Sequence, residues 1–226
     1  MTFQWDLIAR NWPVLLQGLW VTLAVAAVGL TIAILGGALI CAARRSGNAA
    51  LSGAARAVIA FFRITPEVVL IFWAYFCIPL ITGWRVSGFW AGSVTLGLIG
   101  AAYLAEIFRG GIETVPKGQN EAAMALGLPP YPRWRKIVLP QALRVIVPPV
   151  GNEVVSMVKL TSVASVIQFG EVLRSAQTIY YANARVIELL IVAAFWYLAA
   201  VTVLSLGQAV LERRLARGVA PAGRGA

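Results

Sequence analysis

Five long apolar runs constrain this chain more than any other feature of its sequence. They cover about residues 15–43, 57–81, 89–108, 145–169 and 186–211. A helix needs about 20 mostly apolar residues to cross the hydrocarbon core of a bilayer, and each run has that length. The chain is 60% hydrophobic and only 12% charged, whereas soluble domains carry about a quarter charged residues. We therefore expect an all-α polytopic membrane protein with five transmembrane helices.

Composition and residue types exclude several classes of function. The formal net charge of +10 does not indicate nucleic-acid binding, because the cations lie between apolar runs rather than on a soluble face. The chain has no histidine, and Cys41 and Cys77 lie in apolar stretches, so we predict no disulfide framework, metal site or catalytic residue. No phosphate-binding Gly-x-x-x-x-Gly-Lys-Ser/Thr loop occurs, so this chain is not expected to hydrolyse ATP. An intramembrane enzyme would have to rely on a pair such as Ser156 with Lys159.

The distribution of Lys and Arg predicts the orientation of the chain. Five spans place the termini on opposite sides, and cytoplasmic connections carry the excess of cations. The segments after the first, third and fifth runs hold Arg44, Arg45, Arg56, Lys117, Arg133, Arg135, Lys136, Arg144, Arg213, Arg214, Arg217 and Arg224. The other connections hold Arg10, Arg85, Arg174 and Arg185. We therefore predict an extracytoplasmic N-terminus and a cytoplasmic C-terminus.

The same runs divide the chain into three parts. We expect an extracytoplasmic segment at 1–14, a transmembrane domain at 15–217 and a disordered cytoplasmic tail at 218–226. The opening MTFQWDLIARNWP has no basic region before an apolar core. A cleavable signal peptide is therefore not expected, and the first run should stay in the membrane.

The connection of residues 110–144 is too polar to span the membrane, yet it has helical content. The stretch GQNEAAMALGL favours a helix, which Gly127 with Pro129 and Pro130 would end. A second, basic helix is expected from about Tyr131. We predict that the first helix lies along the membrane surface and inserts into a partner's groove. Its small side chains would let that partner approach closely: Ala122, Ala123 and Ala125.

The spacing within this connection resembles a family signature. It reads Glu121-Ala122-Ala123, three residues, Gly127, nine residues, Ile137, one residue and Leu139-Pro140. This pattern is similar to the EAA motif, the signature loop of the membrane subunits of bacterial ABC importers. The resemblance implies a coupling helix that docks into a cleft of the cytoplasmic ATPase. The implied ATPase-coupling residues are Glu121, Ala122, Ala123, Ala125, Leu126 and Gly127.

The likeness extends over nearly the whole chain and leaves out the tail after Ala216. LLQGLWVTL, RITPEVV, YLAEIFRGGIETVPKGQNEAAMALGL and LPQALRVIVPPVGNEVVSMVKLTSVASVI resemble the polar amino-acid uptake branch, with its histidine, arginine and glutamine permeases. This implies a type I ABC importer transmembrane domain that forms a homodimer or a heterodimer with a related permease. It also implies an ABC ATPase dimer, which binds the ATP and Mg, and an extracytoplasmic amino-acid-binding protein. Leu160 departs from the branch, where a polar residue often follows the lysine, and this leaves the substrate less certain.

Charged residues inside apolar runs need a role, because each costs at least about 2.5–3.5 kcal/mol on insertion scales. Arg63 and Glu67 stand four residues apart and could satisfy each other on one helical face. Glu106 has Arg109 one turn on and Tyr103 one turn back. We expect a structural or gating role for six residues: Arg63, Thr65, Pro66, Glu67, Tyr103 and Glu106.

The fourth run carries a polar stripe. On a helix, Asn152, Ser156 and Lys159 fall within about 40° of each other, and Glu153 lies beside them with no cation one turn away. Such residues either line a translocation cavity or join helices through hydrogen bonds, and the sequence leaves both readings open. The predicted substrate-binding set is Asn152, Glu153, Ser156, Lys159, Thr161 and Ser162.

The residues just before the stripe predict an irregular backbone. Pro148, Pro149 and Gly151 favour a broken or unwound helix, which would expose polar groups to a site near the membrane midplane. A zwitterionic amino acid needs acceptors for its ammonium and donors for its carboxylate, and the stripe offers both. Glu153 would also suit a cationic side chain.

The sequence thus predicts the permease subunit of an ABC importer for polar amino acids, basic ones among them, in the bacterial inner membrane, with lipid but no nucleic acid among its partners. The alternative is an ATPase-independent channel or secondary transporter for small polar solutes, which would leave the coupling segment unexplained. The identity of the amino acid, the composition of the dimer, and the share of selectivity held by the cavity or by the binding protein stay open.

Overall fold

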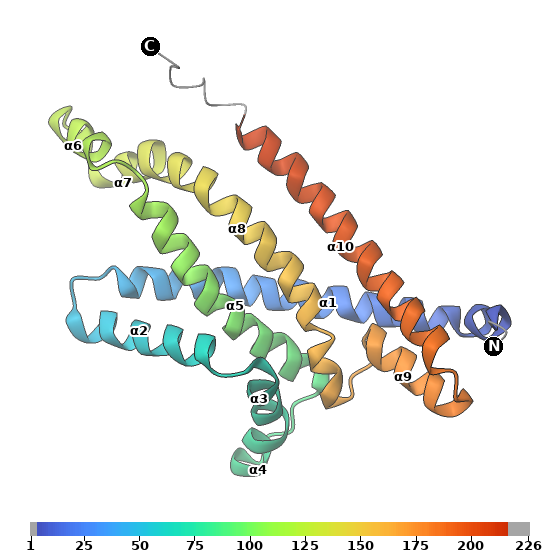
Figure 1. Ribbon diagram of the computed structural model, residues 1–226. Coiled ribbons are helices and arrows are strands. Elements are labelled where there is room, and N and C mark those ends of the chain that lie inside the picture. The colour runs from blue at the N-terminus through green and yellow to red at the C-terminus, as the bar shows by residue number, and fades with distance from the viewer. Residues whose placement is uncertain (1–3, 217–226) are drawn as a thin grey trace.

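Every regular element that the computed structural model describes, within residues 4–216, is a helix (Figure 1). The helices are α1 (Trp5–Arg44), α2 (Ala49–Ile64), α3 (Glu67–Phe72), α4 (Ile78–Thr82), α5 (Gly88–Glu113), α6 (Lys117–Ala125), α7 (Pro130–Arg133), α8 (Leu139–Leu160), α9 (Val172–Asn183) and α10 (Val186–Ala216). Shorter turns join some of them: a π-helical turn at Trp73–Cys77, another at Trp134–Val138, and a 3₁₀ turn at Val163–Ile167.

Four helical stretches are long and apolar enough to cross a membrane: Trp5–Arg44, Gly88–Glu113, Pro130–Ile167 and Val186–Leu215. A fifth span results if the bent pair Ala49–Ile64 and Glu67–Thr82 is counted as one. The prediction of an all-α membrane protein is therefore confirmed.

The second predicted run, 57–81, is not one straight helix. The chain bends by 102° between Ala49–Ile64 and Glu67–Thr82. Thr65 caps α2 with an extended ψ of 132°, because a proline at the next position disfavours the helical conformation. The predicted pairing of Arg63 with Glu67 on one helical face is consequently wrong. The two residues lie on different helices, and no ion pair within residues 4–216 joins them.

Helix α5 forms the centre of the bundle. It packs against α1, α2 and α8, and 67% of its apolar window is buried, compared with 11% for α10. Small residues allow α1 and α5 to approach closely. A Cβ added at Gly97 would lie 2.7 Å from the Ile32 Cβ and 3.0 Å from the Gly29 carbonyl oxygen, so the contact requires glycine there.

The bundle has two distinct ends (Figure 1). At one end lie α6, α7 and the last turns of α10, and we call it the α6 end; at the other, the α9 end, α9 lies with the start of α1. Helix α1 begins at Trp5 and so enters the predicted segment 1–14. The predicted tail 218–226 lies outside the described residues.

A buried carboxylate fixes α9, a helix that was not predicted from the sequence. Glu171 is 0% exposed. It accepts hydrogen bonds from the Leu173 and Arg174 amides and from the Tyr197 hydroxyl of α10, at 2.8, 2.5 and 2.5 Å. Burial raises the pKa of Glu171, and these three donors act in the opposite direction. The Thr22 hydroxyl oxygen of α1 accepts from the Val172 amide of α9 at 3.2 Å, so three helices meet at this point.

Candidate functional site

Helix α6 forms where the sequence predicted a surface helix, and a glycine ends it. Gly127 has a φ of +71°, a conformation in which other residues are strained. Its amide donates to the Met124 carbonyl at 2.9 Å, and the Leu128 amide donates to the Ala123 carbonyl at 3.0 Å. This pair of bonds closes the helix in the Schellman manner. The next helical stretch then starts at Pro130, close to the predicted Tyr131.

The residues of the EAA motif divide between two sides of α6. Glu121, Ala122, Ala125 and Leu126 are exposed, Leu126 by 80%. Ala123 is only 2% exposed, since this side of α6 packs against α7 and the π-helical turn at Trp134–Val138. Ala123 therefore cannot contact a partner directly in this conformation. The close approach expected at Ala123 would have to occur at the exposed residues beside it.

A first cavity, of about 520 Å³, brings together polar and charged residues from three elements. Glu67 comes from α3, Tyr103 from α5, and Glu153, Ser156 and Lys159 from α8. No hydrogen bond or ion pair among residues 4–216 engages the side chains of Glu67, Glu153 or Lys159. We call this the acidic cavity, because it holds two carboxylates and one ammonium group.

The other three members of the predicted substrate set lie elsewhere. The Asn152 Oδ1 is 3.3 Å from the Gln208 Nε2 of α10. Thr161 is 0% exposed, and its hydroxyl donates to the Val158 carbonyl at 2.7 Å. Ser162 donates to the Lys159 carbonyl at 2.6 Å. Of these three contacts, the one at Asn152 joins α8 to α10, whereas those of Thr161 and Ser162 are made to carbonyls three residues earlier in the chain.

The predicted break at Pro148, Pro149 and Gly151 is wrong, because α8 is continuous from Leu139 to Leu160. Gln208 of α10 supports this region by donating to the Pro148 carbonyl at 3.2 Å. A Cβ at Gly151 would lie within 2.6 Å of the Gln208 side chain. Gly151 therefore serves the close packing of α8 and α10 rather than an unwound backbone.

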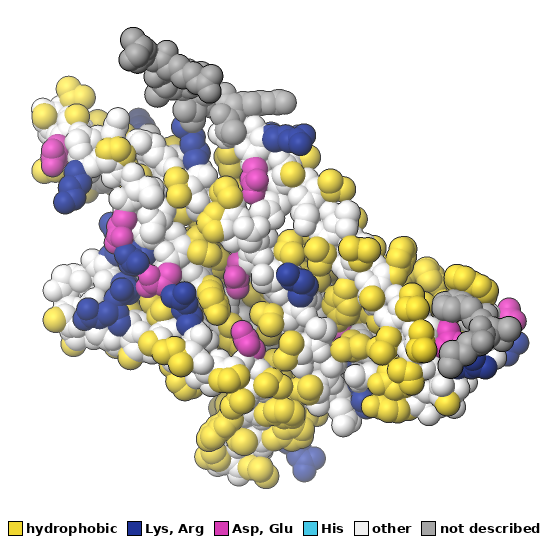
Figure 2. Space-filling model, in the orientation of Figure 1, with side chains coloured by type: hydrophobic (Ala, Val, Ile, Leu, Met, Phe, Trp, Pro, Cys, Tyr) yellow, Lys and Arg dark blue, Asp and Glu magenta, His cyan; other side chains and the backbone are white. Residues whose placement is uncertain are grey.

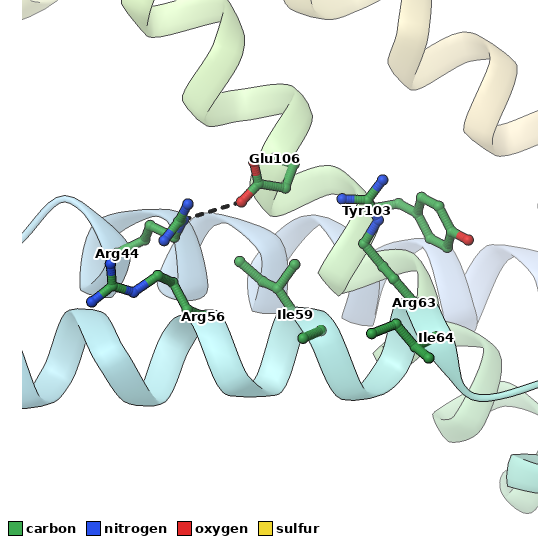
Figure 3. A pocket seen from close by; sticks show the side chains of 8 residues that line it. Arg44, Arg56, Ile59, Arg63, Ile64, Tyr103 and Glu106 are labelled. Atoms are coloured by element: carbon green, nitrogen blue, oxygen red, sulfur yellow. Dashed lines mark hydrogen bonds and ion pairs between the residues drawn. The ribbon is translucent and has the colours of Figure 1, made fainter.

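A second cavity, of about 510 Å³, lies between α1, α2 and α5 (Figure 3). Arg44, Arg56, Arg63, Tyr103 and Glu106 are among its lining residues, and we call it the arginine cavity. Arg63, Tyr103 and Glu106 were expected from the sequence to have a structural or gating role, whereas their proximity to Arg44 and Arg56 was not expected. Only the packing of α1 and α2 against α5 brings these arginines together.

Two kinds of contact organise the arginine cavity. Glu106 accepts from the Arg44 Nε at 3.1 Å and from the Arg109 guanidinium at 2.7 and 3.0 Å. The Arg63 guanidinium lies over the Tyr103 ring, 5.1 Å from its centroid, a cation–π geometry. Thr65 and Pro66 form the break just after Arg63. The expected pair of Glu106 with Arg109 is present, with Arg44 as a further partner.

Both cavities contribute to a charged band in the middle of the molecule. Figure 2 shows Lys, Arg, Asp and Glu side chains crossing one face over α2, α5 and α8. Charges within a membrane span almost always face other protein or a water-filled cavity rather than lipid. This face is therefore unsuited to contact lipid chains.

Comparisons with known proteins identify the family to which the chain belongs. Residues 29–217 match the family described as "Binding-protein-dependent transport system inner membrane component". The chain belongs to this family, and it is a permease subunit of an ABC importer. The EAA motif and the coupling helix are consistent with the family.

Several curated relatives are permeases. The chain is 36% identical over 216 residues to the glutamine transport system permease protein GlnP of Escherichia coli, which covers 95% of this chain and 99% of GlnP. It is 34% identical over 203 residues to the arginine transport system permease protein ArtQ of Bacillus subtilis, covering 90% of this chain and 93% of ArtQ. It is 37% identical to the arginine transport system permease protein ArgU of Corynebacterium glutamicum over 87% of this chain, but it spans only 66% of ArgU.

Solved structures show the same fold. A chain from the "Crystal structure of an amino acid ABC transporter with histidines" superposes with a TM-score of 0.88 at 32% identity, over 95% of this chain and 100% of that chain. A chain of the MetNI methionine ABC transporter in an inward-facing conformation gives a TM-score of 0.73 at 23% identity, over 89% of this chain and 96% of that one. The second likeness speaks for the fold alone.

Proposed function

We propose that this permease carries polar amino acids, with basic ones favoured, and that the acidic cavity binds the substrate. The observation that carries the proposal is the juxtaposition of Glu67 and Glu153 with Lys159 around about 520 Å³. The Lys159 ammonium group would bind the α-carboxylate. One carboxylate would bind the α-ammonium group, and the second is then free for a cationic side chain. The names of GlnP, ArtQ and ArgU support the amino-acid class.

The charged face supports a paired assembly. A band of charges over α2, α5 and α8 would be covered by a second copy of this chain or by a related permease. Substrate would reach the cavity from an extracytoplasmic binding protein at the α9 end. The α6 end would then be cytoplasmic, as the Lys and Arg distribution predicts.

The exposed side of α6 supports docking of an ATPase dimer, which would bind the ATP and Mg. The residues proposed for docking are Glu121, Ala122, Ala125 and Leu126, with Gly127 ending the helix. Helical turns that follow one another from Pro130 to Leu160 join the α6 end to Glu153 and Lys159. Movement of α6 on ATP-driven closure would therefore reach the cavity along one stiff element.

The experiment uses this permease reconstituted in proteoliposomes with its ATPase and its binding protein. We would measure ATP-driven uptake of arginine, lysine, histidine, glutamine and leucine, with Glu153→Gln and Glu67→Gln alongside. We expect the apparent affinity for a basic amino acid to fall about tenfold in Glu153→Gln, as for the loss of one charge-assisted contact, and that for glutamine to change less.

The outcomes separate the possibilities. Neutral substrates carried with no effect of either variant would retain the importer but remove the acidic cavity as its site. Uptake driven by an ion gradient without ATP would favour a channel or secondary transporter instead. Unchanged arginine affinity and rate in Glu153→Gln would contradict the preference for basic amino acids.

A further inference from the structure

The two cavities are neighbours, and Tyr103 lines both of them. Along α5 the order toward α6 is Tyr103, Glu106, Arg109 and the helix end at Glu113. The arginine cavity, which includes Glu106, therefore lies nearer to the α6 end than the acidic cavity does. The volumes of about 510 and 520 Å³ are each sufficient for one amino acid.

The charges of the two cavities are opposite. The acidic cavity sets two carboxylates against one ammonium group, whereas the arginine cavity sets three guanidinium groups against Glu106. Glu106 is already engaged by Arg44 and Arg109. No carboxylate within residues 4–216 pairs with Arg56 or Arg63. The arginine cavity thus holds two guanidinium groups without a carboxylate partner among the described residues, and one of them, Arg63, stacks on Tyr103.

The placement of Arg56 and Arg63 is determined by α2. They stand seven residues apart, which is two helical turns, so they project from the same side of the helix. Ile59 lies between them on that side and is only 6% exposed, because it packs in the cluster of Cys41 and Ala105. This anchor directs both arginines into the cavity, Arg63 beside Tyr103 of α5 and Arg56 near Arg44 of α1 (Figure 3).

We propose that the arginine cavity is a second substrate-binding station, which takes the α-carboxylate of the amino acid after it leaves the acidic cavity. This inference rests on the proposed function and adds to it a site, an order and an orientation. Guanidinium groups attract a carboxylate with paired hydrogen bonds and repel ammonium groups. The carboxylate therefore enters the arginine cavity first, while a cationic side chain trails near Glu67 and Glu153.

The stack of Arg63 on Tyr103 separates the two stations. A carboxylate that passes Tyr103 meets the Arg63 guanidinium at the boundary and can be transferred from there to Arg56. The face of the aromatic ring has no hydrogen-bond donor for the carboxylate. The substrate carboxylate is therefore transferred from Lys159 to Arg63 across an apolar surface. Arg56 and Arg63 are accordingly positioned to determine the rate of release rather than the first binding step.

The test uses proteoliposomes with the permease, its ATPase and its binding protein, and compares Arg56→Gln/Arg63→Gln with the wild type. We expect the kcat for amino-acid uptake to fall about tenfold, as for one lost charge-assisted contact, while the KM for the loaded binding protein changes less than about twofold. Arg85→Gln is the matched control, because this arginine lies between α4 and α5, outside both cavities. It should retain the wild-type kcat.

A rescue experiment separates a lost charge from a damaged fold. Arg56→Cys would be treated with a methanethiosulfonate reagent that attaches an ethylammonium group, and in parallel with one that attaches an ethylsulfonate group. We expect the cationic reagent to restore uptake and the anionic one to leave it low. The wild type receives both treatments, because Cys41 and Cys77 are present as free thiols.

Three results decide the inference. A wild-type kcat in the double variant overturns the second station and leaves the acidic cavity untouched. Equal recovery with both reagents, or with neither, also overturns it, because the proposed role depends on the sign of the charge. Absence of amino-acid uptake by the wild type would instead overturn the proposed function, and the inference with it.

Discussion

The short helices at the two ends of the bundle differ in how the chain holds them. Helix α9 buries Val172, Ser175, Ala176 and Ile179 and contacts both α1 and α10. Helix α6 buries only Ala123 and rests on α7 and the following π-helical turn. A helix with so few internal contacts has little stability of its own. The comparison indicates that α9 is a fixed part of the bundle, whereas α6 needs a partner to complete its environment.

The largest effect on stability is expected at the α9 end. Glu171→Ala removes a helix cap, worth about 0.5–2 kcal/mol, and leaves the hydroxyl of the half-buried Tyr197 without its Glu171 acceptor, at a further cost of about 1–3 kcal/mol. Thermal unfolding in detergent should show a clear fall in melting temperature. Tyr197→Phe, which removes only one of these bonds, should show a smaller fall. An unchanged melting temperature in Glu171→Ala would contradict the conclusion that α9 is a fixed part of the bundle whereas α6 is not.

Gly127→Ala should affect coupling more than the stability of the bundle. A non-glycine residue in the left-handed conformation costs about 1–2 kcal/mol, which corresponds to a loss of about 5- to 30-fold in the population of the docking conformation. ATP-driven uptake in proteoliposomes should fall accordingly, with normal membrane insertion. Gly118→Ala is the matched control, since it lies in α6, has no positive φ and has open space around it. Equal uptake by the two variants would contradict the role of Gly127.

The smallest change in stability is expected at Leu126, whose side chain is 80% exposed. Leu126→Ser should alter the free energy of unfolding by no more than about 0.5 kcal/mol, yet it should weaken binding of the purified ATPase, which biolayer interferometry can measure. Leu80→Ser serves as control, because Leu80 is 85% exposed on α4, away from α6. If both variants bind the ATPase as the wild type does, α6 does not use this residue for docking.

Helices whose length or ends are marked by nearby residues were predictable from the sequence. The apolar runs gave the spans, and Gly127 with Pro129 and Pro130 marked the end of α6 and the start of the next helix. Helix α9 was not predicted because its 12 residues mix polar and apolar types within a segment too short to span a membrane. Its one signal was Glu171 followed by Val172 and Leu173, an acidic residue ahead of an apolar turn.

Other features depended on long-range packing. Pro148 and Pro149 favour a break by themselves, but Gln208 from α10 contacts this stretch and the helix continues. The acidic cavity joins Glu67 to Glu153 only because α3 and α8 both pack against α5. The arginine cavity likewise needs α1 and α2 in place. Periodicity within one run cannot reveal which residues of different runs will face each other.

The difference in burial between α5 and α10 predicts where the sequence tolerates substitutions. On α5, an added methyl group at positions such as Gly97 collides with another helix, so most substitutions there disturb the whole bundle. On α10, only 11% of the apolar window is buried within the chain, and exchanges among Leu, Ile, Val and Phe leave most contacts intact. Mutational tolerance should therefore be concentrated in the last span, and α5 should accept the fewest changes.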